Sequence, residues 1–406
     1  MKRGGVFERP VLRFKHGTAL TPFEGLDMGF KPLVGPSDIS MGLLSYREAS
    51  QDAYQLCRNV VDGFKKFKGL AQVFDCGIKE LSIHVADDPS KLIETSASIP
   101  DSCDVVLALV PDEMMVSYER DPYMPVKRAL AERGIPSQMV NYSTARFLRH
   151  NSYVLFNLAL NIYAKAGGIP WALDEDLHVE AVLGLDAVAD GASLMWLCSW
   201  RKPLLSWSFE EKESTKVKAL NKLLEEGFKQ LKASLNKPIS SIAIHKEGFY
   251  SSEELEVVKY SIEKAVDEGL LYEDCRWFIV SVRRNIPGRI VKSLGLTAAE
   301  NPDKGTYLQL GKYSVMVCTV GFPERHITEY QSPVRPIMVE VVDAKSWDFD
   351  VKHLAKDVYW LSELHWASAF LSTKMPISVL YPSRICSFWH AGLKPGDELR
   401  NRLWFL

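Results

Sequence analysis

Apolar and polar positions along the first 170 residues alternate between strand-like and helix-like periods. Residues 40–48 read as a strand, and residues 104–113 contain a short, fully apolar strand typical of a parallel sheet. A further strand covers residues 135–140, and helical spacing predicts three helices, at Ser50–Lys68, Pro122–Arg133 and Thr144–Lys165. This β–α–β–α order, with right-handed crossovers, predicts a small parallel sheet that carries helices on its faces.

The string Gly-Gly-Ile-Pro-Trp at residues 167–171 breaks the chain, and a second α/β unit follows. Predicted helices cover residues 211–231, 251–269 and 349–370, and a hairpin covers residues 305–321. Strands are predicted at 179–188, 192–200, 238–248, 275–284 and 335–343. Interleaved strands and helices with an internal hairpin fit a mixed sheet of ribonuclease H type, although periodicity alone does not select that fold from other α/β folds.

Composition narrows the class of protein only modestly. The 406 residues allow two or three domains, and 47% apolar with 25% charged residues is ordinary for a globular protein. No apolar run approaches the roughly 20 residues of a membrane span, and the first residues lack the apolar core of a signal peptide, so we expect a cytoplasmic protein with no membrane partner. Seven scattered cysteines without a CxxC pair are expected to be reduced and mostly buried.

Four polar residues in the first unit form a candidate phosphate pocket. Tyr123 and Lys127 are four residues apart on a predicted helix and share one face, Gln138 begins the next strand, and Lys165 ends the following helix. Ammonium groups supply charge to a terminal phosphate, and phenol and amide supply directed hydrogen bonds. By spacing alone, such residues occur on any domain surface. An α/β small-molecule phosphotransferase is disfavoured, since the chain has neither GxxxxGKS nor GxGxxG.

Longer strings around these residues resemble a known family. The strings DPYMPVKRALAERGIPSQMVNYST and IYAKAGGIPW resemble the MID domain of Argonaute proteins, with its Tyr-Lys-Gln-Lys order, and PFEGLDMGFKPLVGP resembles the lead-in of prokaryotic members. VYWLSELHWAS, MPISVLYPSR and the final Trp404-Phe405-Leu406 resemble a PIWI domain. The chain is thereby identified as a member of the short prokaryotic Argonautes, since about 36 residues before the first strand cannot encode N and PAZ domains.

The resemblance implies a domain order and a guide-binding site. The expected parts are an N-terminal lead segment at 1–36, a Rossmann-like MID domain at 37–167 and a ribonuclease H-like PIWI domain at 168–406. Tyr123, Lys127, Gln138 and Lys165 would bind the 5′ phosphate of a guide strand. In the family the chain terminus folds back beside this phosphate, so the Leu406 carboxylate and Gln138 would hold Mg²⁺ or another divalent cation. A merely packed hydrophobic tail is the plain alternative.

The catalytic pattern of PIWI nucleases is incomplete in this chain. Such nucleases hold two metal ions with an Asp-Glu-Asp-Asp/His tetrad. Asp186 matches the first position, whereas Glu247 stands in His-Lys-Glu-Gly where the third position has Asp, and 380–382 offers no acid or histidine for the fourth. Glu210 and Glu211 are candidates for the second position that no motif separates. We therefore expect an inactive PIWI domain with Asp186 and Glu247 as a degenerate remnant; a guide-directed endonuclease with an atypical site is the alternative.

The implied function is guided recognition without cleavage. The guide is expected to be a small RNA and the target a complementary single-stranded DNA, chosen by base pairing in defence against plasmids and phage. Members of the short group act with a separate protein that bears an APAZ region and often an effector domain, so such a partner is expected here. Of the adjacent Arg283 and Arg284, at most one can line a nucleic-acid groove, because neighbouring strand residues point to opposite faces.

Overall fold

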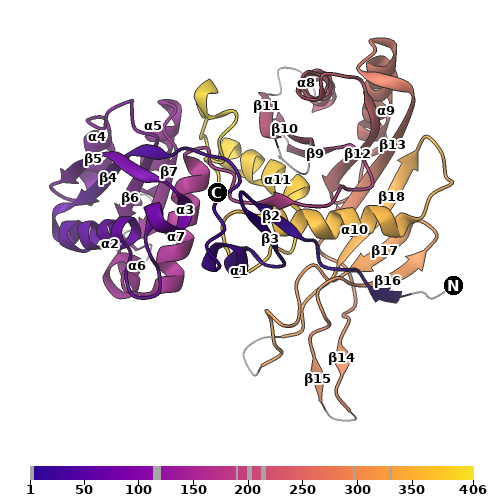
Figure 1. The fold of residues 1–406 in the computed structure, drawn as a ribbon. Coiled ribbons are helices and arrows are strands. Elements are labelled where there is room, and N and C mark those ends of the chain that lie inside the picture. The colour runs from indigo at the N-terminus through magenta and orange to yellow at the C-terminus, as the bar shows by residue number, and fades with distance from the viewer. Residues whose placement is uncertain are drawn as a thin grey trace. The chain divides into compact units, whose positions relative to one another are not determined.

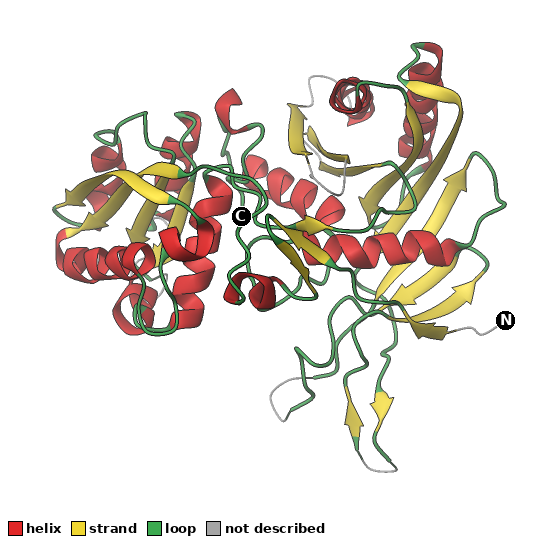
Figure 2. Cartoon of the chain, in the orientation of Figure 1, coloured by secondary structure: helices red, strands yellow, loops and turns green. Residues whose placement is uncertain are grey.

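The computed structural model describes residues 4–112, 120–188, 191–198, 204–211, 216–295, 298–328 and 332–406. The chain divides into two compact units, which are considered separately (Figures 1 and 2). Unit 1 comprises residues 1–12, 172–365 and 370–387. Unit 2 comprises residues 13–171, 366–369 and 388–406, so the last residues of the sequence belong to the same unit as the first predicted sheet.

Unit 2 is built on a four-stranded parallel sheet. Its strands follow the order β5 (Gly77–Ala86), β4 (Asp38–Tyr46), β6 (Val105–Val110) and β7 (Ser137–Asn141). Every residue of β6 is buried, because this apolar strand has a neighbour on each side and helices on both faces. The small parallel sheet is therefore confirmed. Strand β5 was not predicted, and its mixture of buried and exposed residues follows no clean period of two.

Helices cover both faces of this sheet. In Figure 1, α2 and α7 pack together on one face, and α4 and α5 pack together on the other. The helices of the unit are α1 (Pro22–Asp27), α2 (Ser50–Asp62), α3 (Leu70–Phe74), α4 (Leu92–Ser96), α5 (Tyr123–Glu132), α6 (Tyr142–Leu148) and α7 (Ser152–Lys165). Short strands lie at β2 (Leu12–Phe14) and β3 (Gly17–Ala19), and 3₁₀ turns lie at Arg47–Ala49, Pro89–Lys91 and Asp397–Leu399.

Two helices of unit 2 differ from their predicted extent. The helix predicted at Ser50–Lys68 ends at Asp62, because Gly63 adopts a φ of 92°, which glycine tolerates and which stops the helix. The helix predicted at Thr144–Lys165 is two helices, α6 and α7. Asn151 is the N-terminal cap of α7. Its side-chain oxygen accepts hydrogen bonds from the backbone N–H groups of Tyr153 at 3.0 Å and Val154 at 3.3 Å.

Unit 1 is built on a nine-stranded mixed sheet. Strand β12 runs parallel to both of its neighbours, β9 and β13, and the other pairs are antiparallel. The order is β1 (Gly4–Val6), β16 (Thr306–Gly311), β17 (Ser314–Val317), β18 (Ile337–Ala344), β13 (Leu271–Arg283), β12 (Ile239–Glu247), β9 (Ala181–Val188), β10 (Gly191–Cys198) and β11 (Leu204–Glu211). The mixed sheet is as predicted. Strands β1 and β11 belong to it but were not predicted from the sequence.

Helices also cover both faces of the larger sheet. Leu183 of β9 packs against Gly227 of α8, whereas a Cβ at Gly184, on the other face, would lie 1.6 Å from the Ser378 carbonyl of α11. The helices are α8 (Lys216–Leu235), α9 (Ser252–Asp267), α10 (Val351–Leu361) and α11 (Ile377–His390), with a 3₁₀ turn at Ser362–Leu364. Short strands are β8 (Ala172–Leu173), β14 (Lys292–Ser293) and β15 (Ala299–Glu300). The helix predicted at 349–370 is shorter in the structure: α10 ends at Leu361, nine residues before the predicted end. A 3₁₀ turn follows, and the backbone becomes extended at His365.

Two further sequence expectations concern the chain as a whole. No helix among the described residues is both long enough and apolar enough to cross a membrane. The cysteines with described side chains, which are Cys57, Cys76, Cys103, Cys275, Cys318 and Cys386, are free and buried, as predicted. The side chain of Cys198 lies outside the described residues.

Candidate functional site

The four predicted phosphate ligands all belong to unit 2. Tyr123 is the first residue of α5, and its backbone N–H donates to Asp121 Oδ1 at 2.9 Å. Lys127 lies one turn further along α5 and is buried, Gln138 lies on the edge strand β7, and Lys165 is the last residue of α7 and has no exposed surface. The four residues therefore lie on three elements, α5, β7 and α7, at one edge of the sheet.

Two buried ammonium groups join this edge to the end of the chain. Lys165 Nζ donates to Gln138 Oε1 at 2.7 Å and to the main-chain oxygen of Leu406 at 2.5 Å. Lys127 Nζ donates to the main-chain oxygens of Trp404 at 3.1 Å and Ser137 at 3.5 Å. The structure thus brings Lys127, Gln138, Lys165 and Leu406 together, and we call this group the ammonium pocket. Tyr123 lies one helical turn before Lys127.

Apolar burial holds the chain end in the ammonium pocket. Leu403, Trp404 and Phe405 are all buried, and the Trp404 ring lies 5.6 Å from the rings of both Phe405 and Phe388. The Lys127 ammonium also lies 5.2 Å from the centre of the Phe388 ring. The predicted inward docking of the final apolar residues is therefore seen.

Residues 388–406 return to unit 2, and we call them the returning segment. Two hydrogen bonds anchor this segment at points further from the pocket. Arg128 donates to the Ala391 carbonyl at 2.7 Å, and Arg402 donates to the Asp104 carbonyl at 3.1 Å. Sequence reasoning missed Phe388 and these main-chain acceptors. No spacing signal could have found them, because a residue's carbonyl carries no sequence code and Phe388 lies far along the chain from Lys127.

The ammonium pocket has the electrostatic character of an anion site. Burying an ammonium group is costly unless hydrogen bonds and charge compensate it, and here two are buried side by side on the same unit. Neutral carbonyl and amide oxygens provide most of the contacts of Lys127 and Lys165 that are described above. A phosphate would form charge-assisted hydrogen bonds with these ammonium groups, which are stronger than those that neutral oxygens form.

The predicted metal ligands can be examined by their geometry. Gln138 Oε1 and the main-chain oxygen of Leu406 converge on one positive group, the Lys165 ammonium. Oxygen donors of this kind suit a hard cation such as Mg²⁺, so the donor chemistry fits. Across the described part of the chain, no cluster of three or more His, Cys, Asp or Glu side chains could hold a metal ion.

The degenerate acidic pair lies in unit 1. Strands β9 and β12 are parallel, with Leu185 opposite Lys246, so Asp186 and Glu247 stand together at their carboxyl ends. Burial raises the pKa of Asp186 from its ordinary value, and the neighbouring Glu247 carboxylate adds to the rise. Glu247 is itself ion-paired with the Arg284 guanidinium.

The remaining predicted tetrad positions are 380–382 and the candidates Glu210 and Glu211. Residues 380–382 form part of α11, where Tyr381 is buried and its hydroxyl contacts His365 Nδ1 at 3.3 Å. Glu210 and Glu211 end strand β11, and their side chains lie outside the described residues. The structure therefore brings Asp186 and Glu247 together and places an arginine on one of them.

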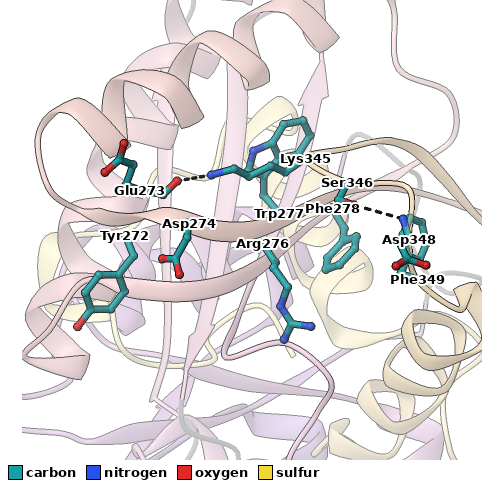
Figure 3. Close-up of a pocket in the computed structure, with 10 residues that line it drawn as sticks. All are labelled: Tyr272, Glu273, Asp274, Arg276, Trp277, Phe278, Lys345, Ser346, Asp348 and Phe349. Carbon is teal, nitrogen blue, oxygen red and sulfur yellow. Dashed lines mark hydrogen bonds between the residues drawn. The ribbon is translucent and has the colours of Figure 1, made fainter.

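A cavity of about 740 Å³ in unit 1 contains none of the predicted site residues. Figure 3 shows its lining, which comes from the first half of β13 and from the segment that follows β18. Because β12 and β13 are parallel and Glu247 lies opposite Val282, this cavity lies toward the end of the sheet away from Asp186 and Glu247. Its aromatic wall includes Phe278 and Phe349, with ring centres 5.1 Å apart.

Comparison with known proteins gives one family. The Piwi domain family matches residues 114–394. A "Piwi protein" of Archaeoglobus fulgidus is 22% identical over 71% of this chain and 69% of its own length. A "Protein argonaute" of Aquifex aeolicus is 24% identical over 93% of this chain but only 51% of its own length, so the chain spans about half of that relative.

Solved structures share the fold across nearly the whole chain. Clostridium butyricum Argonaute, bound to a guide DNA and a target DNA, has a TM-score of 0.76 and 22% identity over 99% of this chain and 54% of that one. Drosophila Piwi has a TM-score of 0.76 and 16% identity over 99% of this chain and 56% of that one. The fold is therefore a Rossmann-like domain with a ribonuclease H-like PIWI domain, and the chain belongs to the Piwi domain family of Argonaute proteins.

Proposed function

We propose that the chain binds the 5′ phosphate of a guide strand through Tyr123, Lys127, Gln138 and Lys165. The observation that carries this proposal is the convergence of two buried ammonium groups at one edge of the unit 2 sheet. A terminal phosphate carries more charge than a backbone phosphodiester, so buried cations favour a strand end over the middle of a strand. The Tyr123 ring, one turn from Lys127, would offer a face for the first base.

We extend the proposal to a bound divalent cation. Gln138 Oε1 and a carboxylate at Leu406 would provide two oxygen ligands for Mg²⁺, and phosphate oxygens and water would provide the others. Both protein oxygens contact the Lys165 ammonium, which supports a cation at this position. In the proposed complex the cation would link the phosphate to the chain end, and Lys165 would remain beside both.

The bound guide would select its target by base pairing. Relatives support nucleic-acid partners: the Clostridium butyricum Argonaute structure contains a guide DNA and a 19-mer target DNA, and the Aquifex aeolicus structure contains an externally bound siRNA. For this chain we propose a small RNA guide and a complementary single-stranded DNA target. Watson–Crick pairing would provide the sequence specificity, and the protein would contact backbone and shape.

We further propose that the chain does not cut its target. Cleavage by two metal ions needs carboxylates that are free to coordinate both ions. Here Glu247 is already engaged by Arg284, and residues 380–382 contain no acid or histidine. The cellular role would then be that of a cytoplasmic targeting subunit in defence against plasmids and phage, with the effector activity in an APAZ-containing partner. A guide-directed nuclease with an atypical site is the competing function.

Guide binding can be tested with matched 5′-phosphorylated and 5′-hydroxyl strands. Direct titration of the full chain should give tighter binding of the phosphorylated strand by about 10- to 100-fold, as expected for charge-assisted hydrogen bonds. Lys165→Met and Lys127→Met keep the length of the side chain and remove the charge, and each should abolish most of this preference. Lys66→Met, at an exposed position of the same unit, is the control and should leave it intact.

The result that would overturn the pocket assignment is an equal loss of affinity for both strands in the lysine variants. Because Lys127 and Lys165 are buried, each variant needs a thermal melt beside the binding measurement. A variant that melts like the wild type yet keeps the 5′-phosphate preference would also refute the assignment. Repeating the titration with EDTA and with Mg²⁺ tests the proposed cation separately.

A further inference from the structure

The cavity of Figure 3 lies where β13 separates from both of its neighbours in the unit 1 sheet. A step of two residues along β12 matches a step of five along β13, from Leu271 to Arg276, so β13 bulges away from β12 there. On the other side, β18 ends at Ala344, opposite Phe278, and the earlier residues of β13 have no partner in it. Bulges of this kind re-aim side chains and are common beside binding sites.

Four aromatic rings lead from the cavity wall toward the surface. The ring centres of Phe278 and Phe349 are 5.1 Å apart, and Phe349 lies 5.7 Å from Tyr313. Tyr313 in turn lies 4.4 Å from Trp347, which is 40% exposed. We call these four residues the aromatic cluster. Aromatic faces at the wall of a cavity suit a planar ring system, which can stack on one ring and meet the edge of another.

Charged side chains of both signs line the same cavity. In Figure 3 the Arg276 side chain leaves β13 toward the same side as Phe278, and Asp348 lies next to Phe349. Within the part of the chain that the structure describes, neither the Arg276 guanidinium nor the Asp348 carboxylate forms an ion pair. Lys345, by contrast, donates to the main-chain oxygen of Glu273. The guanidinium and the Asp348 carboxylate are therefore the groups that a ligand could engage.

The surroundings of Phe278 show where the positive potential lies. The His178 ring is 6.2 Å from the Phe278 ring and 4.9 Å from the His353 ring. Burial lowers the pKa of His178, and the His353 ring and the Arg276 guanidinium lower it further. The guanidinium thus makes the potential beside Phe278 more positive. Guanidinium groups form strong, bidentate hydrogen bonds with phosphate oxygens.

We propose that this cavity binds a purine mononucleotide, with its base against Phe278 and Phe349 and its phosphate at Arg276. Asp348 would accept hydrogen bonds from N–H groups of the base. Guanine has N–H donors on two adjacent ring positions and matches a carboxylate better than adenine, whose amine is its one donor on that edge. The cavity volume of about 740 Å³ falls within the roughly 300–1,000 Å³ of small-molecule sites.

This ligand would be separate from the guide and from the target. Because β12 and β13 are parallel, the cavity lies toward the end of the sheet away from Asp186 and Glu247. The ammonium pocket belongs to unit 2, whereas every residue that lines the cavity belongs to unit 1. The inference therefore goes beyond the proposed function and does not depend on it.

The charges at the cavity favour a monophosphate. Asp274 precedes Arg276 by two residues on β13 and also lines the cavity. Together with Asp348 it places two carboxylates near a single guanidinium that is not engaged in an ion pair among the described residues. These carboxylates oppose a large negative charge on the ligand. GMP should therefore bind more tightly than GTP.

Calorimetric titration of the full chain with GMP, AMP, GTP and guanosine tests the proposal. GMP should bind about tenfold or more tightly than guanosine or AMP, because each of these lacks one set of charge-assisted hydrogen bonds. Arg276→Gln should bind GMP no better than the wild type binds guanosine, and Asp348→Asn should no longer distinguish GMP from AMP. Both residues are exposed, so both variants should fold normally.

The matched controls remove exposed charges of the same unit at positions outside the cavity lining. Arg289→Gln removes a cation and Glu253→Gln removes an anion, and both variants should keep the wild-type affinity for GMP. If Arg289→Gln weakens GMP as much as Arg276→Gln does, net charge alone governs binding and the inference is overturned. Failure of the wild type to bind GMP overturns it directly, as does equal affinity for GMP and guanosine.

GMP carries a 5′ phosphate, so its binding must also be separated from the ammonium pocket. The titration is repeated with an excess of a 5′-phosphorylated RNA strand, and GMP should still bind to the cavity with the same affinity. GMP binding that disappears with the strand and is unchanged in Arg276→Gln would place the nucleotide in the ammonium pocket and overturn the inference. If the chain shows no preference for 5′-phosphorylated strands, the proposed function fails, while the Arg276→Gln and Asp348→Asn titrations still decide the inference.

Discussion

The ammonium of Lys127 donates a hydrogen bond to the main-chain oxygen of Trp404 at 3.1 Å, across 277 positions of sequence. A buried lysine on a helix is thereby satisfied by the backbone of a segment that returns to unit 2 after the whole of unit 1 has been traversed. The Trp404 side chain, almost wholly buried, determines where that carbonyl lies. The packing of one aromatic residue is therefore coupled to the position of a proposed phosphate ligand.

The first prediction concerns this coupling. Trp404→Ala should reduce the free energy of unfolding by about 3–5 kcal/mol, as for other buried aromatic residues, and should weaken the 5′-phosphorylated guide more than the 5′-hydroxyl guide. Chemical denaturation and guide titration measure the two effects. Phe147→Ala in the same unit, at a side chain that is 72% exposed, is the control and should change neither. A destabilised Trp404→Ala protein with an intact 5′-phosphate preference would uncouple the chain end from the pocket.

The second prediction concerns cleavage. With Mn²⁺ and a fully matched guide–target pair, the protein should give no defined product, because Glu247 is paired with Arg284 and 380–382 supplies no ligand. Gel analysis of end-labelled target is sufficient. Asp186→Asn should behave like the wild type. A single cut opposite the middle of the guide that disappears in Asp186→Asn would establish the competing nuclease.

The third prediction concerns stability in acid. Burial lowers the pKa of both His245 and His365 to about 3. An unfolded histidine titrates near 6.5, so the stabilising effect of keeping each ring neutral is complete above about pH 6.5 and is lost as the pH falls toward 3. The free energy of unfolding should decline by at most about 1.4 kcal/mol per pH unit for each histidine. His245→Asn can still form a hydrogen bond with Ser378. In denaturant melts this variant should lack the part of the decline in unfolding free energy that His245 contributes.

The fourth prediction has the opposite sign. Burial raises the pKa of Asp357 to about 8, although its carboxyl group accepts the backbone N–H of His178 at 3.0 Å. A raised acid pKa stabilises the fold fully below the unfolded value near 4, and the effect is lost as the pH rises through 8. Asp357→Asn cannot ionise and keeps an acceptor oxygen, so the difference in unfolding free energy between variant and wild type should grow in favour of the variant from about pH 4 to 8. A constant difference would contradict the prediction.

The fifth prediction concerns a buried ion pair of unit 1. Lys304 contacts Glu363, with both side chains 3% exposed, and also lies 3.0 Å from Glu324. Lys304→Met should lower the free energy of unfolding by about 3–5 kcal/mol, because two carboxylates lose a buried partner. Lys292→Met breaks a pair with Asp303 at 3.4 Å whose side chains are about half exposed, and should change stability by less than about 1 kcal/mol. Equal effects would show that burial does not govern these pairs.

Local chemistry explains which elements the sequence could predict. The apolar run inside the predicted strand at 104–113 favoured a buried strand, and β6 covers that run at Val105–Val110. The four-residue spacing of Tyr123 and Lys127 placed both on α5. The split between α6 and α7 was harder: helical spacing continues through 149–151, and only the side-chain capping of Asn151 marks the second start. Strand β5 lies at the edge of its sheet and has no regular apolar period to detect.

The candidate sites were likewise predictable in part. Residue types and order pointed to Lys127, Gln138 and Lys165, but the main-chain oxygens that meet them could not be inferred, because any residue supplies one. Asp186 and Glu247 could be named from their strings, whereas the ion pair of Glu247 with Arg284 could not, because only the pairing of β13 with β12 brings these two residues together.

The returning segment at 388–406 also sets an order of events during synthesis. Lys127 and Lys165 leave the ribosome more than 200 residues before the carbonyls of Trp404 and Leu406 that they contact. At typical elongation rates of about 5–20 residues per second, this interval lasts roughly 10 to 50 seconds. A nascent or truncated chain would therefore lack the main-chain oxygens of Trp404 and Leu406, which these two lysines contact. If the ammonium pocket binds the guide as proposed, guide loading would wait until the segment that contains Trp404 and Leu406 has been synthesised and has docked.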